Sequence, residues 1–270
     1  ACKRADLEKA GSDFDIIVHL AGSSSAPMFT ENGITEPYIN SVMSFTQVLD
    51  FAAATGVSKV LYASTSSLYG NNPLPLVESQ QVTPQNHYAV TKFLYEHCAS
   101  CFAKTYPQLD IIGFRFMSVY GPNEEAKGKY ANIVSQFLWD VARGQPPVIY
   151  GDGEQNRDFT HVTDVIQALC LAIETERKLG AEVFNIGTGH AYSLNEIVAA
   201  ITQAMESDIA PIYIENPVKE VYVRGQCADI AKISEVLGYV PKVDLTDGIR
   251  QQVESLRMER IRETSSDGLR

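Results

Sequence analysis

The stretch Asp15-Ile16-Ile17-Val18-His19-Leu20 decides the fold of this 270-residue chain. Its apolar residues follow one another and several are β-branched, which is typical of a short strand buried on both faces of a parallel sheet. The run ends in Ala21-Gly22-Ser23-Ser24-Ser25, where small and hydroxyl residues replace the apolar ones. We therefore predict a buried parallel strand whose carboxyl end carries small polar side chains.

Two later runs repeat this pattern, and helical stretches at Pro37 to Thr55 and Tyr88 to Tyr106 separate the three. The order strand, helix, strand, helix, strand predicts an α/β fold with a doubly wound parallel sheet. In such sheets ligands bind beyond the carboxyl ends of the strands, so we expect the three polar clusters to meet at one site. The later runs are Lys59-Val60-Leu61-Tyr62-Ala63, followed by Ser64-Thr65-Ser66-Ser67, and Ile111-Ile112-Gly113-Phe114-Arg115-Phe116, followed by Met117-Ser118.

The alternation loosens after Gly121-Pro122-Asn123, and the back part of the chain predicts a small mixed α/β cap. Ser193-Leu194-Asn195-Glu196 has the spacing of a capping box, so we expect a helix to begin there. Other expected elements are helices near Ala131 to Arg143 and Thr163 to Glu176, and strands at Val148-Ile149-Tyr150 and Val183-Phe184-Asn185-Ile186.

The charge balance argues against nucleic acid as a partner. The chain has 22 Lys and Arg against 33 Asp and Glu, a formal net charge of −11, and no basic run. Such a surface repels a phosphorylated small molecule as well. Any anion site must therefore be local, built from one or two arginines and backbone amides.

The sequence gives no sign of a membrane segment or a metal site. No apolar run is long enough to span a bilayer, and no signal-peptide core follows Ala1, so we expect a cytoplasmic protein. The five cysteines are scattered, as in proteins of a reducing compartment. Cys98 and Cys101 form a C-x-x-C inside a helical pattern, and without a second cysteine or histidine cluster we predict no metal there.

Tyr88 and Lys92 are the most informative pair of polar residues. A spacing of four places both side chains on one face of a helix. A lysine cation beside a tyrosine lowers the pKa of the phenol from about 10 and makes it an acid/base group. The pair alone also occurs by chance on exposed helices. Thr65, at the end of a predicted strand, supplies a hydroxyl that can share a proton with Tyr88, and the three together indicate an active site.

At these residues the chain resembles the extended short-chain dehydrogenase/reductases of the NAD-dependent epimerase/dehydratase family, and within them the UDP-glucose (UDP-galactose) and UDP-glucuronate 4-epimerases. The resemblance covers nearly the whole chain. Its segments are Asp15 to Ala21, Ser64 to Gly70, Tyr88 to Lys92, Arg115 to Pro122, Tyr150 to Asp164 and Asn185 to Gly189.

The resemblance implies a Rossmann-like sheet that holds NAD and a C-terminal cap that holds a nucleotide sugar, UDP-hexose or UDP-hexuronate. Tyr88 would be the catalytic base, Lys92 would also hold the nicotinamide ribose, and Thr65 would polarise the sugar oxygen. The implied domains are residues 1–122 for the partial NAD-binding domain, with segments at about 145–187 crossing back, and residues 123–258 for the cap. Residues 259–270 form a polar tail that we expect to fray.

Further site residues follow from the resemblance. Arg157 would clamp the diphosphate, since a planar guanidinium can bond two phosphate oxygens; the alternative is a surface salt bridge with Asp158. Asn40 would order the Lys92 end of the site; the alternative is an exposed polar residue. The remaining positions are Ala21, Gly22, Ala63 and Phe116 toward the cofactor, and Ser24, Ser118, Ile133 and Tyr150 toward the substrate.

Two departures from the family limit the activity. Ser66 and Ser67 stand where dehydratases of the family have an acidic pair, so dehydration is not expected. The second phosphate ligand stays open between Lys219 and Arg224. The alternatives to a 4-epimerase are a heptose 6-epimerase, a nucleotide-sugar decarboxylase or reductase, and a non-catalytic nucleotide-sugar binding protein.

The family begins with a strand, a G-x-x-G-x-x-G turn and a helix that hold the cofactor pyrophosphate, and no such segment precedes Asp15. About two strand-helix units of roughly 30 residues are missing by comparison. We expect the 270 residues alone to lack useful NAD affinity and epimerase activity and to be poorly soluble. The resemblance also implies a homodimer through the two long helices, and the residues expected on the exposed faces are Phe45, Leu49, Leu94 and Cys98.

Overall fold

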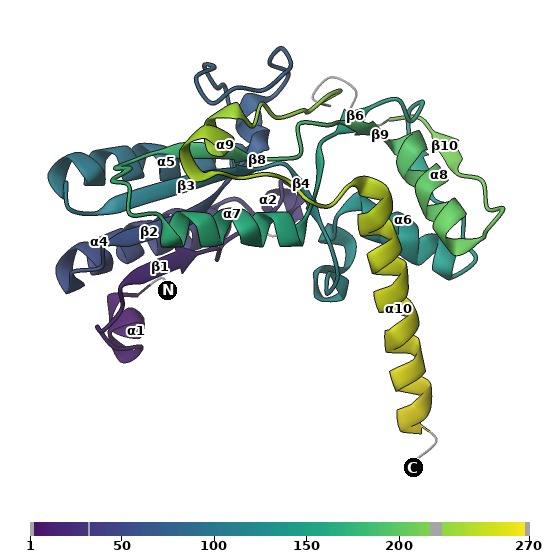
Figure 1. Cartoon of the computed structure of the whole chain (residues 1–270), viewed down its shortest axis with the longest axis horizontal. Coiled ribbons are helices and arrows are strands. Elements are labelled where there is room, and N and C mark those ends of the chain that lie inside the picture. The colour runs from purple at the N-terminus through teal and green to yellow at the C-terminus, as the bar shows by residue number, and fades with distance from the viewer. Residues whose placement is uncertain (1–2, 32, 217–222, 268–270) are drawn as a thin grey trace.

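A four-stranded parallel sheet forms the centre of the larger part of the molecule (Figure 1). The computed structural model describes residues 3–31, 33–216 and 223–267. The strand order is β1-β2-β3-β8, and all three pairings are parallel. The bounds are β1 Ile16–His19, β2 Lys59–Thr65, β3 Asp110–Phe116 and β8 Val183–Ile186. The predicted doubly wound sheet is confirmed.

Helices cover both faces of this sheet because successive strand residues point to opposite sides. Val60 and Tyr62 of β2 pack with α4 and α5, whereas Leu61 between them packs with α7 and α9. All three side chains are fully buried. The sheet is therefore the middle of three layers. The covering helices are α4 Ser44–Thr55, α5 His87–Thr105, α7 Val162–Glu174 and α9 Ala231–Leu237.

The helix predicted at Pro37 to Thr55 is present but is not a regular α-helix. It comprises α3 Thr35–Tyr38, a π-helical turn η1 Ile39–Met43, and α4. The Tyr95 hydroxyl on α5 donates to the Ser41 carbonyl inside this turn at 2.8 Å. π-Turns inside helices often occur near functional sites, and this one lies against the helix that carries Tyr88 and Lys92.

Phe45 and Leu49 are buried rather than exposed, which corrects the prediction of a dimer-facing side. Both are 0% exposed, and the Phe45 ring stacks on Tyr95 with centroids 4.3 Å apart. Together with Val48 and Ala52 they form the stripe of α4 that faces the sheet. Leu94 and Cys98 on α5 are half-buried. Only these two remain near the surface.

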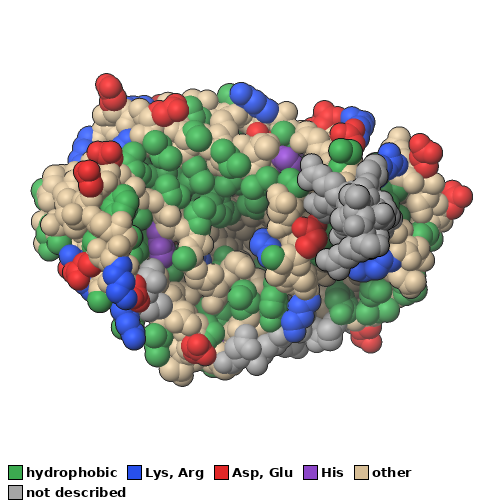
Figure 2. All heavy atoms as spheres, turned by 90° about the horizontal axis from the view of Figure 1, so that it is seen from below, with side chains coloured by type: hydrophobic (Ala, Val, Ile, Leu, Met, Phe, Trp, Pro, Cys, Tyr) green, Lys and Arg blue, Asp and Glu red, His purple; other side chains and the backbone are tan. Residues whose placement is uncertain are grey.

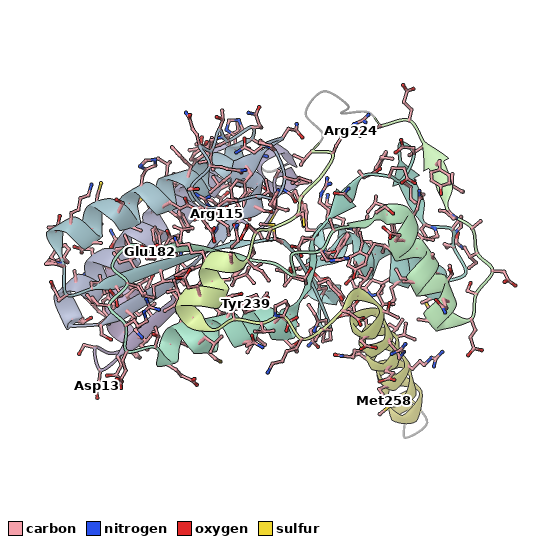
Figure 3. All side chains as sticks on the ribbon, turned by 45° about the horizontal axis from the view of Figure 1, so that its top comes forward. Asp13, Arg115, Glu182, Arg224, Tyr239 and Met258 are labelled. Atoms are coloured by element: carbon pink, nitrogen blue, oxygen red, sulfur yellow. The ribbon has the colours of Figure 1, made fainter. Side chains whose placement is uncertain are left out.

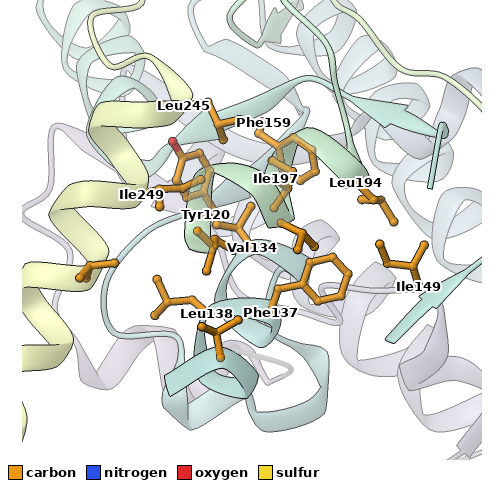
Figure 4. Close-up of a cluster of buried hydrophobic side chains, with 14 residues drawn as sticks. Tyr120, Val134, Phe137, Leu138, Ile149, Phe159, Leu194, Ile197, Leu245 and Ile249 are labelled. Atoms are coloured by element: carbon orange, nitrogen blue, oxygen red, sulfur yellow. The ribbon is translucent and has the colours of Figure 1, made fainter. Parts of the chain in front are cut away.

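The cap has its own hydrophobic core (Figure 4). Tyr120 and Phe137 pack there with Ile197 of α8 and Ile249 of α10. The predicted capping box at α8 is confirmed, because the Ser193 and Glu196 side chains each bond the other residue's backbone N–H. The cap elements are β4 Ser118–Tyr120, η3 Glu125–Tyr130, α6 Ile133–Ala142, β5 Val148–Tyr150, β6 Asn156–Arg157, β7 Phe159–His161, β9 Tyr192–Ser193, α8 Leu194–Met205, β10 Ile212–Ile214 and α10 Leu245–Asp267.

The predicted polar tail is helical as far as the structure describes it. Helix α10 continues to Asp267 and extends away from the cap (Figure 1), whereas a frayed tail was expected from residue 259. Its first turns bury Ile249 and Val253 in the cap core. Once such turns are fixed, each added residue extends the helix at little cost.

Strand β1 is the outer strand of the described sheet. Val18 is 40% exposed and Leu20, just beyond the strand, is 52% exposed. Figure 2 shows the lower face of the molecule, where hydrophobic side chains gather around a hollow. The remaining short helices of the sheet domain are α1 Arg4–Lys9, α2 Pro27–Glu31 and η2 Ser66–Tyr69. None of the described helices is long and apolar enough to cross a membrane.

Candidate active site

A cavity of about 590 Å³ opens at the carboxyl ends of β1, β2 and β3. The polar clusters that follow the three strands meet there, as the sheet topology predicts. Eight of the predicted site residues line it: Gly22, Ser24, Ala63, Thr65, Tyr88, Lys92, Phe116 and Ser118. The cavity lining contains two lysines and no Asp or Glu, in a chain of net charge −11.

The start of α5 fixes where Tyr88 and Lys92 lie. The Asn86 side chain caps the helix by accepting the Ala89 N–H at 2.9 Å. Tyr88 therefore lies in the first turn and Lys92 one turn later, on the same face. The Lys92 side chain reaches across to β2, where its Nζ donates to the Ala63 carbonyl at 2.9 Å.

Lys92 is a buried cation, 3% exposed. Burial lowers its pKa from 10.5 to about 8. Its Nζ lies 4.5 Å from the centre of the Tyr95 ring, an arrangement in which the ring face stabilises the charge. At neutral pH the ammonium is therefore still charged, but in an environment that opposes the charge.

Tyr88 does not have the lowered pKa that the sequence predicts. Burial raises the pKa of its phenol, and a hydrogen bond with the Thr65 side chain counteracts part of the rise. The Lys92 Nζ lies 6.0 Å from the centre of the Tyr88 ring and is bonded to Ala63. Tyr88 and Lys92 do lie on one face of α5, as their spacing predicts. The Lys92 ammonium, however, bonds the carbonyl of Ala63 on β2 rather than the phenol oxygen.

Thr65 joins the last position of β2 to the turn η2. Its Oγ1 accepts the Ser67 N–H at 3.2 Å, which caps the turn, and the residue is 5% exposed. The expected contact between the Thr65 and Tyr88 side chains is thus accompanied by a contact that holds the threonine in place. Ser66 and Ser67 line the cavity, and neither position supplies a carboxylate.

A second cavity of about 470 Å³ lies on the cap side. It is lined by the predicted substrate residues Ile133, Tyr150 and Arg157, and Ser118 lines both cavities. Asn132 is also common to both, because it caps helix α6 and its Nδ2 donates to Ser118 Oγ at 3.0 Å. The two cavities are adjacent, and their shared wall is the start of α6.

Arg157 is held by backbone carbonyl groups rather than by Asp158. Its guanidinium donates to the carbonyls of Asn156 at 2.7 Å and Val223 at 2.6 Å. The expected alternative, a surface salt bridge with Asp158, is wrong because Asp158 is fully buried. The Asp158 carboxylate instead accepts the N–H groups of Thr188, Gly189 and Ala228.

Three predicted residues lie elsewhere. Ala21 and Asn40 are exposed and are not among the lining residues of either cavity; Asn40 belongs to the π-helical turn. Arg224 lines a third cavity of about 470 Å³ beside Tyr150 and Asn156. Lys219, the other candidate for the second phosphate ligand, lies outside the described residues.

The lining residues of the first cavity that the sequence interpretation missed include Asn132, Lys127, Tyr130 and Gln226. Asn132 has a local signal, since it is an N-cap residue before the apolar stretch of α6. Lys127 and Tyr130 belong to the irregular turn η3, and Gln226 comes from a loop far along the chain. These three have no pattern that indicates the cavity before the chain is folded.

The Lys92 environment fits the ribose end of a dinucleotide. An ammonium has three donors, and within the described residues the Ala63 carbonyl is the acceptor that Lys92 has. Two N–H groups therefore remain at the cavity wall for the hydroxyls of a ligand. The chain's described part has no cluster of three or more His, Cys, Asp or Glu that could hold a metal.

Comparisons with known proteins identify the family of the chain. The model of the NAD dependent epimerase/dehydratase family matches residues 1–187. A putative UDP-glucose 4-epimerase of Methanocaldococcus jannaschii is 30% identical over 247 residues, which cover 91% of this chain and 78% of that protein.

Two solved structures are similar over most of the chain. UDP-glucose 4-epimerase of Thermotoga maritima with UDP-glucose has a TM-score of 0.88 at 29% identity, covering 96% of this chain and 82% of that one. UDP-glucuronic acid 4-epimerase of Bacillus cereus with UDP-glucuronic acid and NAD has a TM-score of 0.84 at 26% identity, covering 94% and 78%. With its parallel sheet and its threonine, tyrosine and lysine around one cavity, the chain belongs to the NAD dependent epimerase/dehydratase family.

Proposed function

We propose that the protein is an NAD-dependent 4-epimerase of a UDP-linked hexose or hexuronate. One observation carries the proposal: Thr65, Tyr88 and Lys92 line a cavity that adjoins a second cavity with Arg157 and Tyr150. The first cavity suits a sugar ring and the nicotinamide end of the cofactor, and the second suits a nucleotide diphosphate. The similar proteins named above act on UDP-sugars or contain them.

The chain's own residues supply the proton transfer and the positioning. Bound NAD would supply a reversible hydride acceptor for the sugar carbon. Tyr88, in its phenolate form, would take the proton of the sugar hydroxyl at that carbon and later give it back. Burial raises the pKa of this phenol in the ligand-free protein, so the positive charge of a bound nicotinamide would have to favour the phenolate. Thr65, already within hydrogen-bond contact of Tyr88, would hold the same sugar oxygen in line with the phenol. Lys92 would bond the ribose hydroxyls through the two ammonium N–H groups that are not bonded to the Ala63 carbonyl.

The cap residues would hold the rest of the substrate. Arg157 lies in the lining of the second cavity, is positioned by backbone carbonyls and would bond the diphosphate through its guanidinium. The amino end of α6, with Ile133 in its first turn, would add backbone N–H groups to the same anion. Arg224 would be the second phosphate ligand among the described residues. Tyr150 would lie against the nucleotide base.

Product analysis decides between this function and its rivals. The protein in its full natural length, with NAD and one UDP-sugar at a time, should convert UDP-glucose or UDP-glucuronate into its 4-epimer, as measured by proton NMR. A product changed at carbon 6, a product that has lost carbon dioxide, or net formation of NADH would favour one of the alternative enzymes. Binding of UDP-sugar by calorimetry without turnover would favour a non-catalytic binding protein.

The same proposal includes separate cofactor-binding and substrate-binding parts of the chain, and a homodimer. Residues 1–122, together with α7, β8 and α9 of the sheet domain, would bind the cofactor, and the cap elements from residue 123 onward would bind the substrate. A dimer would form through the outer sides of α4 and α5, where Leu94 and Cys98 are half-buried. Light scattering at micromolar concentration tests it, and a monomeric mass would contradict it.

A further inference from the structure

A buried network centred on Glu96 lies directly behind the catalytic residues. Tyr88, Lys92 and Glu96 follow one another at intervals of four on one face of α5. The Glu96 carboxylate accepts Ser64 Oγ at 2.6 Å, Arg115 Nε at 2.9 Å and Arg115 Nη2 at 2.7 Å. The Glu96 and Arg115 side chains are only 12% and 6% exposed. Figure 3 shows Arg115 within the sheet domain.

Ser64 connects this network to two catalytic groups. It stands between Ala63, whose carbonyl holds Lys92, and Thr65, whose side chain contacts Tyr88. Side chains alternate along a strand, so the Ser64 hydroxyl points away from Thr65 and toward α5. Its bond to Glu96 therefore joins the last residues of β2 to the helix that carries Tyr88 and Lys92.

Arg115 extends the network to the other strands. It lies opposite Ser64 in the sheet register and directly precedes Phe116 of the cavity. Its guanidinium lies 4.8 Å from the centre of the Tyr69 ring, and the Tyr69 hydroxyl donates to Asn185 of β8 at 2.8 Å. The network thus touches β2, β3, β8, η2 and α5.

Stability alone is a weak reason for such a pair. Buried ion pairs can often be replaced by apolar residues of similar volume without loss of stability, because desolvation offsets most of the attraction. A carboxylate bound by a two-pronged guanidinium and a hydroxyl has, however, a fixed direction that apolar packing lacks. The Glu96–Arg115 pair therefore fixes the relative positions of the elements that it joins. Catalysis is sensitive to displacements of about an ångström in such positions.

We propose, on the basis of the proposed function, that Ser64 and Glu96 are positioning residues of the epimerase. They hold the end of β2 against α5, so that the Thr65 hydroxyl and the Ala63 carbonyl stay where Tyr88 and Lys92 require them. Neither side chain needs to touch the substrate for this role.

Ser64→Ala tests the proposal without leaving a buried charge unpaired. Its matched control is Ser44→Ala, which removes another buried hydroxyl, 3% exposed, from α4. Both proteins should lose a similar, small amount of thermal stability. Only Ser64→Ala should lose turnover, with kcat lower on the order of tenfold and KM for the UDP-sugar unchanged. Equal kcat values in the two variants would overturn the proposal, as would a rise in KM alone.

Two further measurements keep the test decisive. Glu96→Leu combined with Arg115→Met removes both charges together. This double variant should fold and should still have low kcat, and wild-type kcat in the folded double variant would contradict the proposal.

Carbon-13 NMR of labelled tyrosine, with Tyr88 assigned through Tyr88→Phe, needs no turnover. The Tyr88 signal should move in Ser64→Ala and not in Ser44→Ala. If the wild type converts no UDP-sugar, the proposed function fails, and an unmoved Tyr88 signal separately refutes the positioning.

Discussion

Replacing Lys92 by methionine should stabilise the folded protein while it abolishes turnover. Lys92 is 3% exposed, and burial lowers its pKa from 10.5 to about 8. Each pKa unit corresponds to about 1.4 kcal/mol, so the charged lysine costs the folded state about 3 kcal/mol at neutral pH. Methionine fills a similar volume without a charge. Because the Ala63 carbonyl then loses a donor, we expect a net gain of roughly 1 to 3 kcal/mol.

The sign of the pH dependence follows from the lowered pKa. Below pH 8 the lysine is charged in both states, and the full penalty is present. Between pH 8 and 10.5 the unfolded chain holds a proton that the folded protein has released, so wild-type stability rises with pH. The advantage of Lys92→Met should therefore be constant below pH 8 and should shrink toward zero near pH 10.5.

Urea unfolding at pH 7, 8, 9 and 10 measures both effects, and the difference between the two proteins cancels the titration of other groups. Lys59→Met is the control, because Lys59 bonds the carbonyls at the end of α7 and should only lose stability. A Lys92→Met protein that is less stable than the wild type at pH 7, or a stability difference that does not change with pH, would refute the reasoning.

Three further substitutions have defined outcomes. Tyr88→Phe should abolish epimerisation and leave UDP-sugar binding nearly unchanged by calorimetry, because the ring stays and only the proton carrier is lost; near-normal turnover would contradict the mechanism. Gly113→Ala should destabilise the protein by roughly 1 to 3 kcal/mol or more in urea unfolding, since a Cβ there would lie 2.5 Å from the Tyr62 ring; an unchanged urea midpoint would contradict this. His19, 5% exposed, has its pKa lowered from 6.5 to about 4 by burial and by Lys92; the unfolded chain alone binds its proton across that window, so stability should fall from pH 6.5 toward 4, and His19→Leu should flatten the fall. An equally steep fall in His19→Leu would count against the buried neutral imidazole.

Much of the sheet domain could be predicted because its signals are local. The runs at Lys59 and Ile111 each contain enough apolar β-branched or aromatic residues to specify a strand, and the carboxyl-end rule then brings Thr65, Tyr88 and Lys92 together. The capping box at Ser193 needs only four consecutive residues. These features do not depend on the rest of the chain.

The errors concern residues whose environment is set by distant parts of the chain. Phe45 and Leu49 are apolar in a helix, but only the position of Tyr62 and Tyr95 decides that they are inside. From the sequence, the Lys92 ammonium could bond either the Tyr88 phenol or a strand carbonyl. The position of β2 beside α5 brings the Ala63 carbonyl within hydrogen-bond distance of it. Gln226 reaches the cavity from a loop more than a hundred residues away from Thr65, and no local pattern indicates it.

The most direct test of the central claim follows one hydrogen atom. UDP-glucose and UDP-glucuronate carrying deuterium at carbon 4 are incubated in turn with the full natural-length protein and NAD, and the products are examined by NMR. Transient oxidation with return of the hydride predicts that one of the two gives the 4-epimer with deuterium still at carbon 4 and none lost to water. Deuterium lost to water, or no epimer from either sugar although both bind, would contradict the account.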